Sequence, residues 1–146
     1  MTTIRCATEQ DAPHVHRLIE LLEAPQKYDF ERFSHKYRSS LTDPSITYLV
    51  AEAEGAVCAF GSLLFSSPLH HEGPVAEIVE LVVEEGCRGA GVGAAMVEEM
   101  AAQARARGCC ILELSTNRAR ERAHRFYERQ GFRLTHYRFT MALSKD

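Results

Sequence analysis

The segment Val79–Gly93, VELVVEEGCRGAGVG, decides the interpretation of this chain. An apolar strand runs into an arginine, and glycines follow at positions 89, 91 and 93. Glycine lets the backbone turn tightly and approach a ligand without an intervening side chain. The next residues, AAMVEEMAAQARARG, predict a helix whose first N–H groups point back at the loop. Those unpaired amides and the positive end of the helix dipole favour an anion, so the segment predicts a phosphate cradle.

Two familiar phosphate loops fit this segment poorly. A Walker loop requires Lys and Ser or Thr after its last glycine, to reach the terminal phosphates and the magnesium. Ala94 and Ala95 stand there, so a Walker loop is excluded. A Rossmann fingerprint can be placed on Gly89, Gly91 and Ala94, with Glu113 at a tolerable distance for a ribose contact. The rest of the chain is too short for a dinucleotide-binding sheet, so this match is weak.

The remaining option is the R-x-x-G-x-G loop that binds the pyrophosphate of coenzyme A, and it reads directly as Arg88, Gly91 and Gly93. Residues 117–132, NRARERAHRFYERQGF, follow the apolar strand CCILELS and predict a helix that ends at Gly131. Their spacing resembles the closing half of the GCN5-related N-acetyltransferases, and the loop resembles the acetyl-CoA motif of that family. The matching positions of the second segment are Asn117, Ala123, Phe126, Tyr127, Gly131 and Phe132.

The resemblance extends over nearly the whole chain. The opening IRCATEQD is similar to the first strand and helix of the superfamily. Similarity to the aminoalkylphosphonate N-acetyltransferases runs through IVELVV, ELSTN, AHRFY and HYRFTMAL, and through LTDP, Tyr48 and the paired His70 and His71. Residues 20–40 match loosely, and this region usually shapes the acceptor pocket in the superfamily.

The resemblance implies an α/β fold, in which a central mixed sheet of six to seven strands is flanked by about four helices and a splayed central strand holds acetyl-CoA. The residue patterns agree with it. Strands are predicted over 2–7, 46–53, 56–67, 75–83 and 110–115, with one or two more over 132–143, and helices over 9–24 and 28–41, from 92 and from 118. Thr8 with Asp11 is a capping-box pattern for the first helix. Glu54 and Gly55 predict a hairpin turn between the second and third strands.

Composition agrees with one small N-acetyltransferase domain over residues 1–146. The chain is 45% hydrophobic and 25% charged, with a formal net charge of -3. One core can therefore form, and neither disorder nor a general affinity for nucleic acid is indicated. No leader pattern and no apolar run of about 18 residues is found, so we expect a cytoplasmic protein without a membrane partner. The five cysteines lack C-x-x-C or zinc spacing and are expected to be reduced thiols.

The resemblance implies where acetyl-CoA lies. Its pantetheine arm would bond backbone groups of Leu81 and Val83 on the central strand, and Asn117 would meet the arm from the other side. The residues expected to bind acetyl-CoA are Leu81, Val83, Arg88, Gly89, Ala90, Gly91, Val92, Gly93, Ala94 and Asn117.

Acyl transfer to an amine requires that the amine first loses a proton. For an amine of pKa about 10, deprotonation at pH 7 costs roughly 4 kcal/mol, so a carboxylate or a water chain that accepts the proton matters. Glu77 and Glu80 on the central strand are the candidate bases. Strand alternation predicts that their side chains point to opposite faces. The resemblance implies that the superfamily's base lies on the same face of this strand as Glu77. Both glutamates recur in the resemblance to the aminoalkylphosphonate enzymes. For each of them the alternative is a carboxylate with a structural role only.

Tyr127 is expected to be the general acid that protonates the leaving thiolate. A phenol near pKa 10 is a poor donor to a thiolate whose acid is near 8.5, so the transfer must be coupled to carbon–sulfur cleavage or helped by burial. A packed tyrosine beside Phe126 on an amphipathic helix is the alternative.

Four further residues are candidates for the acceptor site. His70 and His71, with Glu72, could contact an anionic acceptor or ligate a divalent metal, although adjacent histidines are poor chelators. His136 and Arg138 are acceptor candidates on the resemblance. Whether the protein requires a divalent metal stays open.

The sequence therefore predicts an enzyme that moves acetyl from acetyl-CoA to a small primary amine, with an aminoalkylphosphonate as the favoured acceptor. The family resemblance also implies a homodimer. A polyamine, an aminoglycoside or a protein N-terminus could be the acceptor in the same chemistry. An acetyl-CoA-binding module without turnover and a nucleotide-binding module are the alternatives of a different class.

Overall fold

The computed structural model describes residues 1–144. This part of the chain divides into two compact units, Met1–Leu114 and a second unit from Ser115 onward. The expectation that residues 1–146 act as one N-acetyltransferase domain stays a prediction. Within the described residues, no helix combines the length and the apolar character needed to cross a membrane.

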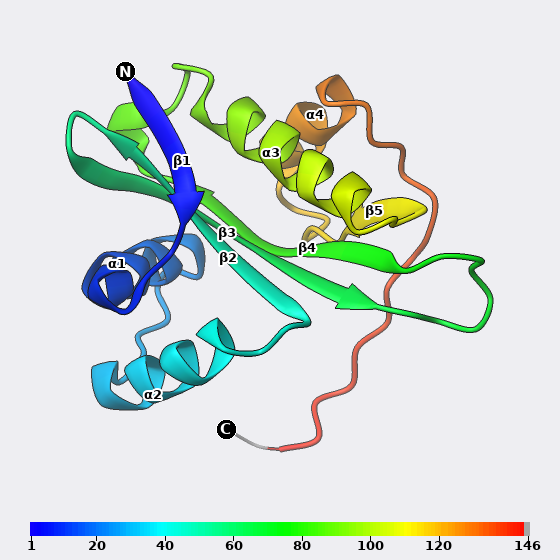
Figure 1. The fold of residues 1–146 in the computed structure, drawn as a ribbon, viewed down its shortest axis with the longest axis horizontal. Coiled ribbons are helices and arrows are strands. Elements are labelled where there is room, and N and C mark those ends of the chain that lie inside the picture. Colours follow the sequence, from blue (N-terminus) through cyan, green and yellow to red (C-terminus); the bar gives the residue numbers. More distant parts are fainter. Residues whose placement is uncertain (145–146) are drawn as a thin grey trace. The chain divides into compact units, whose positions relative to one another are not determined.

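The first unit is built on a five-stranded mixed sheet in the order β1-β2-β3-β4-β5 (Figure 1). Neighbouring strands are antiparallel except β4 and β5, which run parallel. The strands are β1 (Thr2–Cys6), β2 (Ile46–Ala53), β3 (Ala56–Ser66), β4 (Val75–Val83) and β5 (Ile111–Leu114). The mixed α/β fold predicted from the sequence is confirmed, and β2 and β4 begin and end at the predicted residues.

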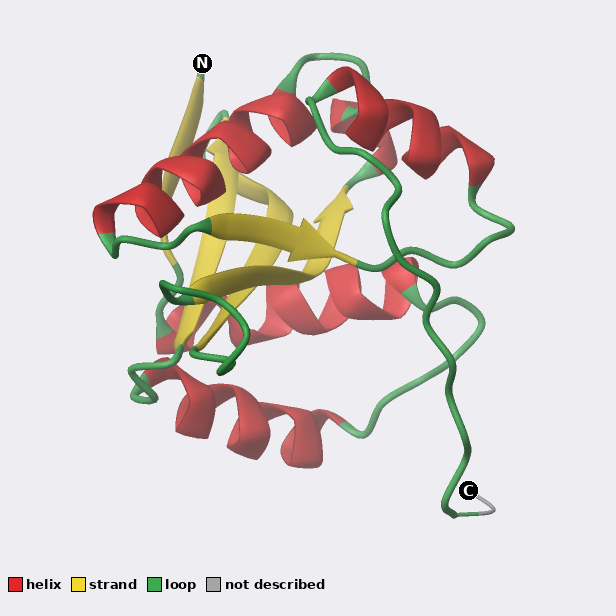
Figure 2. Ribbon diagram, turned by 90° about the vertical axis from the view of Figure 1, so that its right-hand side faces the viewer, coloured by secondary structure: helices red, strands yellow, loops and turns green. Residues whose placement is uncertain are grey.

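Helices cover both faces of this sheet (Figure 2). One face carries α1 (Ala12–Leu22) and α2 (Phe30–Leu41), and the other carries α3 (Val92–Ala106). On the α1/α2 face a hydrophobic core joins helices and strands, and its members include Val15, Leu18, Tyr37, Val50, Phe60 and Val82. On the α3 face Met96 and Met100 pack so closely on Gly61 that a Cβ there would lie 2.5 Å from Met100 Cε. Full burial of such side chains stabilises the fold by about 1.5–3 kcal/mol each.

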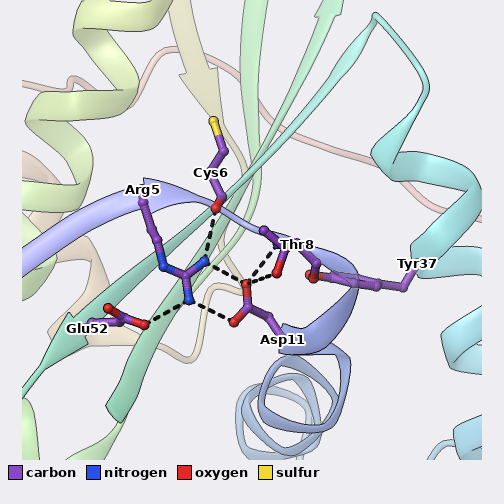
Figure 3. A network of polar contacts seen from close by, with 6 residues as sticks. All are labelled: Arg5, Cys6, Thr8, Asp11, Tyr37 and Glu52. Carbon is purple, nitrogen blue, oxygen red and sulfur yellow. Dashed lines mark hydrogen bonds and ion pairs between the residues drawn. The ribbon is translucent and has the colours of Figure 1, made fainter. Parts of the chain in front are cut away.

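The predicted capping box precedes the first helix. Thr8 N–H donates to Asp11 Oδ2 at 2.8 Å, and a short 3-10 turn, η1 (Glu9–Asp11), leads into α1. Arg5 on β1 donates to both oxygens of Asp11, at 2.8 and 2.9 Å, and to Glu52 Oε1 on β2 at 2.9 Å (Figure 3). The Arg5 guanidinium holds the pKa of Asp11 below its usual value of 3.8, although burial opposes this. The network links β1, β2 and the start of α1.

The predicted hairpin between β2 and β3 is also confirmed. Glu54 and Gly55 form its turn with φ of 53° and 80°. Two successive left-handed residues give the turn whose twist matches that of the flanking strands.

The second unit contains α4 (Glu121–Arg129), which is followed by Gly131 at φ 99°. The prediction of one or two strands over 132–143 is wrong, because residues 132–144 form no strand. Apolar side chains in this stretch are 82% to 94% exposed: Leu134, Tyr137, Phe139, Met141 and Leu143. Near alternation of apolar and polar residues suggests a strand. A strand forms, however, only where another strand bonds its N–H and C=O groups. The described sheet therefore has five strands rather than six or seven.

Candidate active site

The predicted phosphate loop connects β4 to α3. After Val83 the chain makes a short 3-10 turn, η2 (Glu85–Cys87), and then Gly89 and Gly91 adopt φ of 83° and 82°, with Ala90 between them. Glycine enters this left-handed region without the penalty that a side chain brings. A Cβ built on either glycine would meet no atom within 4 Å. The backbone angle therefore requires glycine here, and the space over the loop is open to a ligand.

The start of α3 supplies hydrogen-bond donors to this loop. Gly91 is the N-cap of the helix, and Ala95 N–H donates to its carbonyl oxygen at 3.0 Å. The N–H groups of Val92, Gly93 and Ala94 come before that bond and have no helical carbonyl one turn back. Three adjacent amides at the positive end of a helix dipole form the kind of site that binds a pyrophosphate.

Arg88 fastens the loop to the end of the strand. Its Nε donates to Val83 O at 3.0 Å, and its Nη1 lies 3.8 Å from Glu85 Oε1. The Arg88 side chain is 48% exposed, so its guanidinium has room for a phosphate oxygen. The Val83 carbonyl, one of the groups expected to meet the pantetheine arm, thus already accepts one hydrogen bond.

The pairing of β4 with β5 ends before β4 does. The register runs from Val75–Ile111 to Ile78–Leu114, whereas β4 continues to Val83. Leu81 lies in this last part of β4. Within Met1–Leu114 its only strand partner is Gly61 of β3. On the other side of β4 the backbone of Leu81 therefore has no strand partner within this unit, as a pantetheine arm would require, whereas the Val83 carbonyl already accepts from Arg88.

A β-bulge interrupts β4 at Val79. Ser62 pairs with Glu80 and Leu63 pairs with Ile78, so Val79 is left without a partner of its own on β3. A bulge places one extra residue in a strand and shifts the alternation of all side chains beyond it.

Because of the bulge, Glu77 and Glu80 lie on the same face of the sheet. Glu77 pairs with Leu64 and Glu80 with Ser62, and these two β3 residues are two positions apart. Residues two apart on a strand share a face, and so do cross-strand partners. The sequence-based expectation that the two carboxylates point to opposite faces is therefore wrong.

Ser62 is a contact of Glu80 that sequence reasoning missed. The Ser62 hydroxyl donates to Glu80 Oε1 and accepts from Glu80 N–H at 3.0 Å. Ser62 is only 2% exposed. The carboxylate of Glu77 has no hydrogen bond or ion pair with any residue from 1 to 144, so the two glutamates differ in how firmly they are held.

Tyr48 is a polar neighbour of Ser62 on the adjacent strand, and the sequence pointed to it only through the resemblance. It pairs with Ser62 across β2 and β3 and stacks on Tyr37 of α2, with ring centroids 5.4 Å apart. Burial raises the pKa of the Tyr48 phenol, and the nearby charge of Glu80 adds to this. Tyr48 therefore remains protonated and can donate at neutral pH.

In the second unit, Tyr127 lies on α4 between two aromatic neighbours. Its ring centroid is 5.1 Å from that of Phe126 and 5.6 Å from that of Phe132, both in edge-on arrangements. Burial raises the pKa of the Tyr127 phenol, and Arg120 partly opposes this. The phenol is therefore protonated at neutral pH, as a general acid must be before it donates.

Asn117 stands in the turn before α4. Its Oδ1 accepts from Ala119 N–H at 2.9 Å, and its carbonyl oxygen lies 2.9 Å from His124 Nε2. These bonds fix the turn and leave the side-chain amide NH₂ of Asn117 without a described partner.

His70 and His71 lie in the exposed loop between β3 and β4, with ring centroids 4.4 Å apart. His71 Nδ1 is 3.9 Å from Sγ of Cys110, the residue before β5, and that thiol also lies 3.6 Å from Gly73 O. The described residues contain no cluster of three or more His, Cys, Asp or Glu side chains that could hold a metal ion. His71 is thus brought near a thiol, and His70 packs against His71.

The other two acceptor candidates, His136 and Arg138, lie in the strandless stretch 132–144, and both are exposed. His136 Nδ1 is 2.7 Å from the hydroxyl of its neighbour Thr135.

Residues 14–132 match the family model described as the Acetyltransferase (GNAT) family. The match covers well over half of the chain and includes the phosphate loop, both glutamates and α4. The chain belongs to the GNAT family and is an acetyl-CoA-dependent N-acetyltransferase.

Individual relatives agree with this membership. The chain is 39% identical to the aminoalkylphosphonate N-acetyltransferase of Salmonella typhimurium over 141 residues, which cover 96% of this chain and 90% of that protein. It is 25% identical to the IAA acetyltransferase of Azospirillum brasilense over 84% of this chain and 81% of that one.

Solved structures share the fold. A transcriptional regulator from Bacillus halodurans superposes with a TM-score of 0.91 at 25% identity, over 98% of this chain and 100% of that one. Glucosamine-6-phosphate N-acetyltransferase from Arabidopsis thaliana superposes with a TM-score of 0.85 at 20% identity, over 99% of each chain.

Proposed function

We propose that this acetyltransferase acts on a small primary amine and that the amine is an aminoalkylphosphonate. Support for the acceptor comes from the 39% identity to the Salmonella enzyme of that name, which extends over 96% of this chain. The observation that carries the chemistry is the pair Glu77 and Glu80, two carboxylates on one face of β4 ahead of a glycine loop.

The donor acetyl-CoA would be held by the loop and the strand. Its pyrophosphate would accept from the N–H groups of residues 91–94, and Arg88 would add charge-assisted bonds. Its pantetheine arm would follow Leu81 and Val83 along the side of β4 that β5 leaves open, with the Asn117 amide as a further donor. These residues supply position and hydrogen bonds, and the thioester of acetyl-CoA supplies the activated acetyl group.

The acceptor amine must reach the thioester as a free base. A glutamate on β4 takes a proton from the ammonium, and the N–H bonding electrons remain on nitrogen as a lone pair. That lone pair attacks the acetyl carbonyl carbon and a C–N bond forms. The C–S bond then breaks, and the nitrogen, now positively charged, releases its second proton to water and becomes the neutral amide. Removing the proton costs roughly 4 kcal/mol at pH 7 for an amine of pKa about 10, which is the cost that a positioned base reduces.

The leaving sulfur carries the electrons of the broken C–S bond, and Tyr127 would donate its phenolic proton to it. Because the phenol is intrinsically the weaker acid, this proton moves as the C–S bond lengthens and charge builds on sulfur. Solvent returns the proton to Tyr127 after the products leave.

The phosphonate of the acceptor needs cationic or hydrogen-bonding partners. His70, His71, His136 and Arg138 are the residues proposed to supply them, since guanidinium and imidazole groups match phosphonate oxygens in charge and geometry.

A thiol-release assay tests the proposal directly. With acetyl-CoA, aminomethylphosphonate and 2-aminoethylphosphonate should release free thiol with higher kcat/KM than spermidine, an aminoglycoside or a peptide N-terminus. Ethylamine is the matched control, because it lacks only the phosphonate of 2-aminoethylphosphonate. Equal rates with ethylamine and 2-aminoethylphosphonate would contradict the acceptor assignment, and release with spermidine alone would replace it.

A thermal-shift panel separates the other classes. A ligand at about 100 times its Kd stabilises the folded state by about 2.7 kcal/mol. Acetyl-CoA should raise the Tm, and NAD and ATP should not. A rise with acetyl-CoA but no thiol release with any amine would indicate a binding module without turnover. The homodimer and the cytoplasmic location stay predictions, and light scattering of the purified protein checks the former.

A further inference from the structure

A row of three polar side chains crosses the sheet on the α1/α2 face. Tyr48, Ser62 and Glu80 are successive cross-strand partners on β2, β3 and β4. Their strand neighbours Phe60 and Val82 belong to the core beneath α1. A polar residue that is 2% exposed at the edge of such a core, as Ser62 is, must have its hydrogen bonds satisfied or it destabilises the fold.

The Ser62 hydroxyl is both a donor and an acceptor toward one residue, Glu80. It accepts from the Glu80 N–H at 3.0 Å, and its single proton goes to Glu80 Oε1. A hydroxyl has one proton to donate, so this carboxylate takes all that Ser62 can give. Ser62, on β3, thereby bridges the carboxylate and the backbone N–H of Glu80, next to the bulge at Val79.

The second carboxylate oxygen is left available. Glu80 Oε2 has no hydrogen bond or ion pair with the described residues, and neither has the carboxylate of Glu77. Glu80 therefore combines a fixed oxygen with an oxygen that can accept a proton, whereas no hydrogen bond or ion pair from residues 1–144 fixes Glu77. A proton acceptor works best when its rotamer is locked by a neighbouring hydrogen bond.

We propose that Ser62 is a positioning residue that holds Glu80 so that Oε2 receives the proton of the acceptor amine. The N–H bond of the ammonium breaks, its electrons stay on nitrogen and the proton joins Oε2, from which it later passes to water. The proposal rests on the proposed acetyl transfer to an amine and selects Glu80 over Glu77 as the base.

A double-mutant cycle tests it, with Ser62→Ala, Glu80→Gln and the double variant. Ser62→Ala should lower kcat on the order of tenfold, the loss expected for one hydrogen bond to a charged group, and leave the KM for acetyl-CoA within about twofold. Ser62→Thr keeps the hydroxyl and should restore most of kcat. In the Glu80→Gln background Ser62→Ala should lower kcat no further, because the two residues act as one unit.

Ser34→Ala is the matched control. Ser34 is a serine on α2 that is 5% exposed, and its hydroxyl has no hydrogen-bond partner among the described residues. The control should keep the wild-type kcat, which separates loss of a buried hydroxyl from loss of this particular contact. Melting curves and acetyl-CoA titrations of each variant establish that it is folded.

The idea fails if Ser62→Ala keeps the wild-type kcat, if Glu80→Gln does, or if Ser62→Ala is equally harmful in both backgrounds. Should Ser62→Ala not fold, Ser62→Cys retains a weaker donor: a kcat between wild type and Glu80→Gln supports the idea, and a wild-type kcat overturns it. Absence of thiol release by the wild-type protein with every amine would instead refute the proposed function.

Discussion

Glu77 and Glu80 share one face of the sheet because Val79, between them, is the extra residue of a β-bulge. In an unbroken strand these two positions would face opposite ways. The bulge therefore brings two carboxylates of one strand to the same side, and the hydroxyl of Ser62 distinguishes them by binding only Glu80.

The two glutamates should differ in their effect on turnover. Glu80→Gln should lower kcat about 100-fold, the lower end of what general base catalysis contributes, and Glu77→Gln should lower it less. Steady-state thiol release measures both. Glu98→Gln, at an exposed glutamate on α3, is the control and should be unchanged. The reverse order of effects would make Glu77 the base.

The loop glycine at the N-cap of α3 should be needed for donor binding. Gly91→Ala forces an alanine to φ 82°, which costs about 1–2 kcal/mol although its Cβ meets no atom. We expect acetyl-CoA affinity to fall about tenfold, measured by calorimetric titration. Gly86→Ala is matched, because its Cβ also meets nothing and its φ is not left-handed. Equal acetyl-CoA affinities for the two variants would contradict a phosphate-binding role for this loop.

Tyr127→Phe should lower kcat without loss of acetyl-CoA affinity. Phenylalanine keeps the edge-on contacts with Phe126 and Phe132 and removes only the proton that is donated to sulfur. A general acid contributes about 100-fold or more to kcat, so this is the expected loss. Tyr137→Phe, at a side chain that is 89% exposed, is the control. Unchanged turnover in Tyr127→Phe would end the assignment.

The ion pair between Arg5 and Asp11 should make the free energy of unfolding depend on pH in the acidic range. Since Arg5 lowers the pKa of folded Asp11, the pair's contribution is complete above the usual value of 3.8 and disappears as pH falls through the lower, folded value. Asp11→Asn should reduce the free energy of unfolding by about 2 kcal/mol at pH 7.

Urea unfolding at pH 7, 5 and 3 checks this. The difference between wild type and Asp11→Asn should be equal at pH 7 and 5 and smaller at pH 3. Glu9→Gln changes an exposed carboxylate in the same turn and serves as the control. A difference that grows toward pH 3 would show that the sign of the linkage is wrong.

Cys58 should be the slowest thiol to react in the folded protein. Burial, with a hydrogen bond to Cys87, raises the pKa of Cys58 to about 11. At pH 8 only about a thousandth of it is the reactive thiolate. Timed alkylation with iodoacetamide and peptide mapping should show exposed Cys6 modified before buried Cys58. Equal rates for the two thiols would contradict the burial of Cys58.

Most elements were predictable because they depend on local patterns. Residues 46–53 and 75–83 are apolar runs bounded by turn residues, and they match β2 and β4. Thr8 with Asp11, and Glu54 with Gly55, are short-range signals that fix a helix start and a hairpin. The phosphate loop was found for the same reason, since its glycines and the following helix are contiguous in the chain.

What escaped prediction depends on which strands pair, and how. The bulge at Val79 is visible only in the register between β3 and β4. Ser62 lies 18 positions before Glu80 and meets it only through that register. The alternation in residues 132–144 suggested a strand, yet no strand pairs with it among residues 1–144. Side-chain patterns indicate which face of a strand could be buried, but not which backbone will pair with it.

The most direct test of the central claim is a crystal structure of the protein with acetyl-CoA. The diphosphate oxygens should lie about 3 Å from the backbone nitrogens of residues 91–94, with the pantetheine arm along the open side of β4 beyond Ile78. Acetyl-CoA bound elsewhere, with this turn making no contact to its phosphates, would contradict the account.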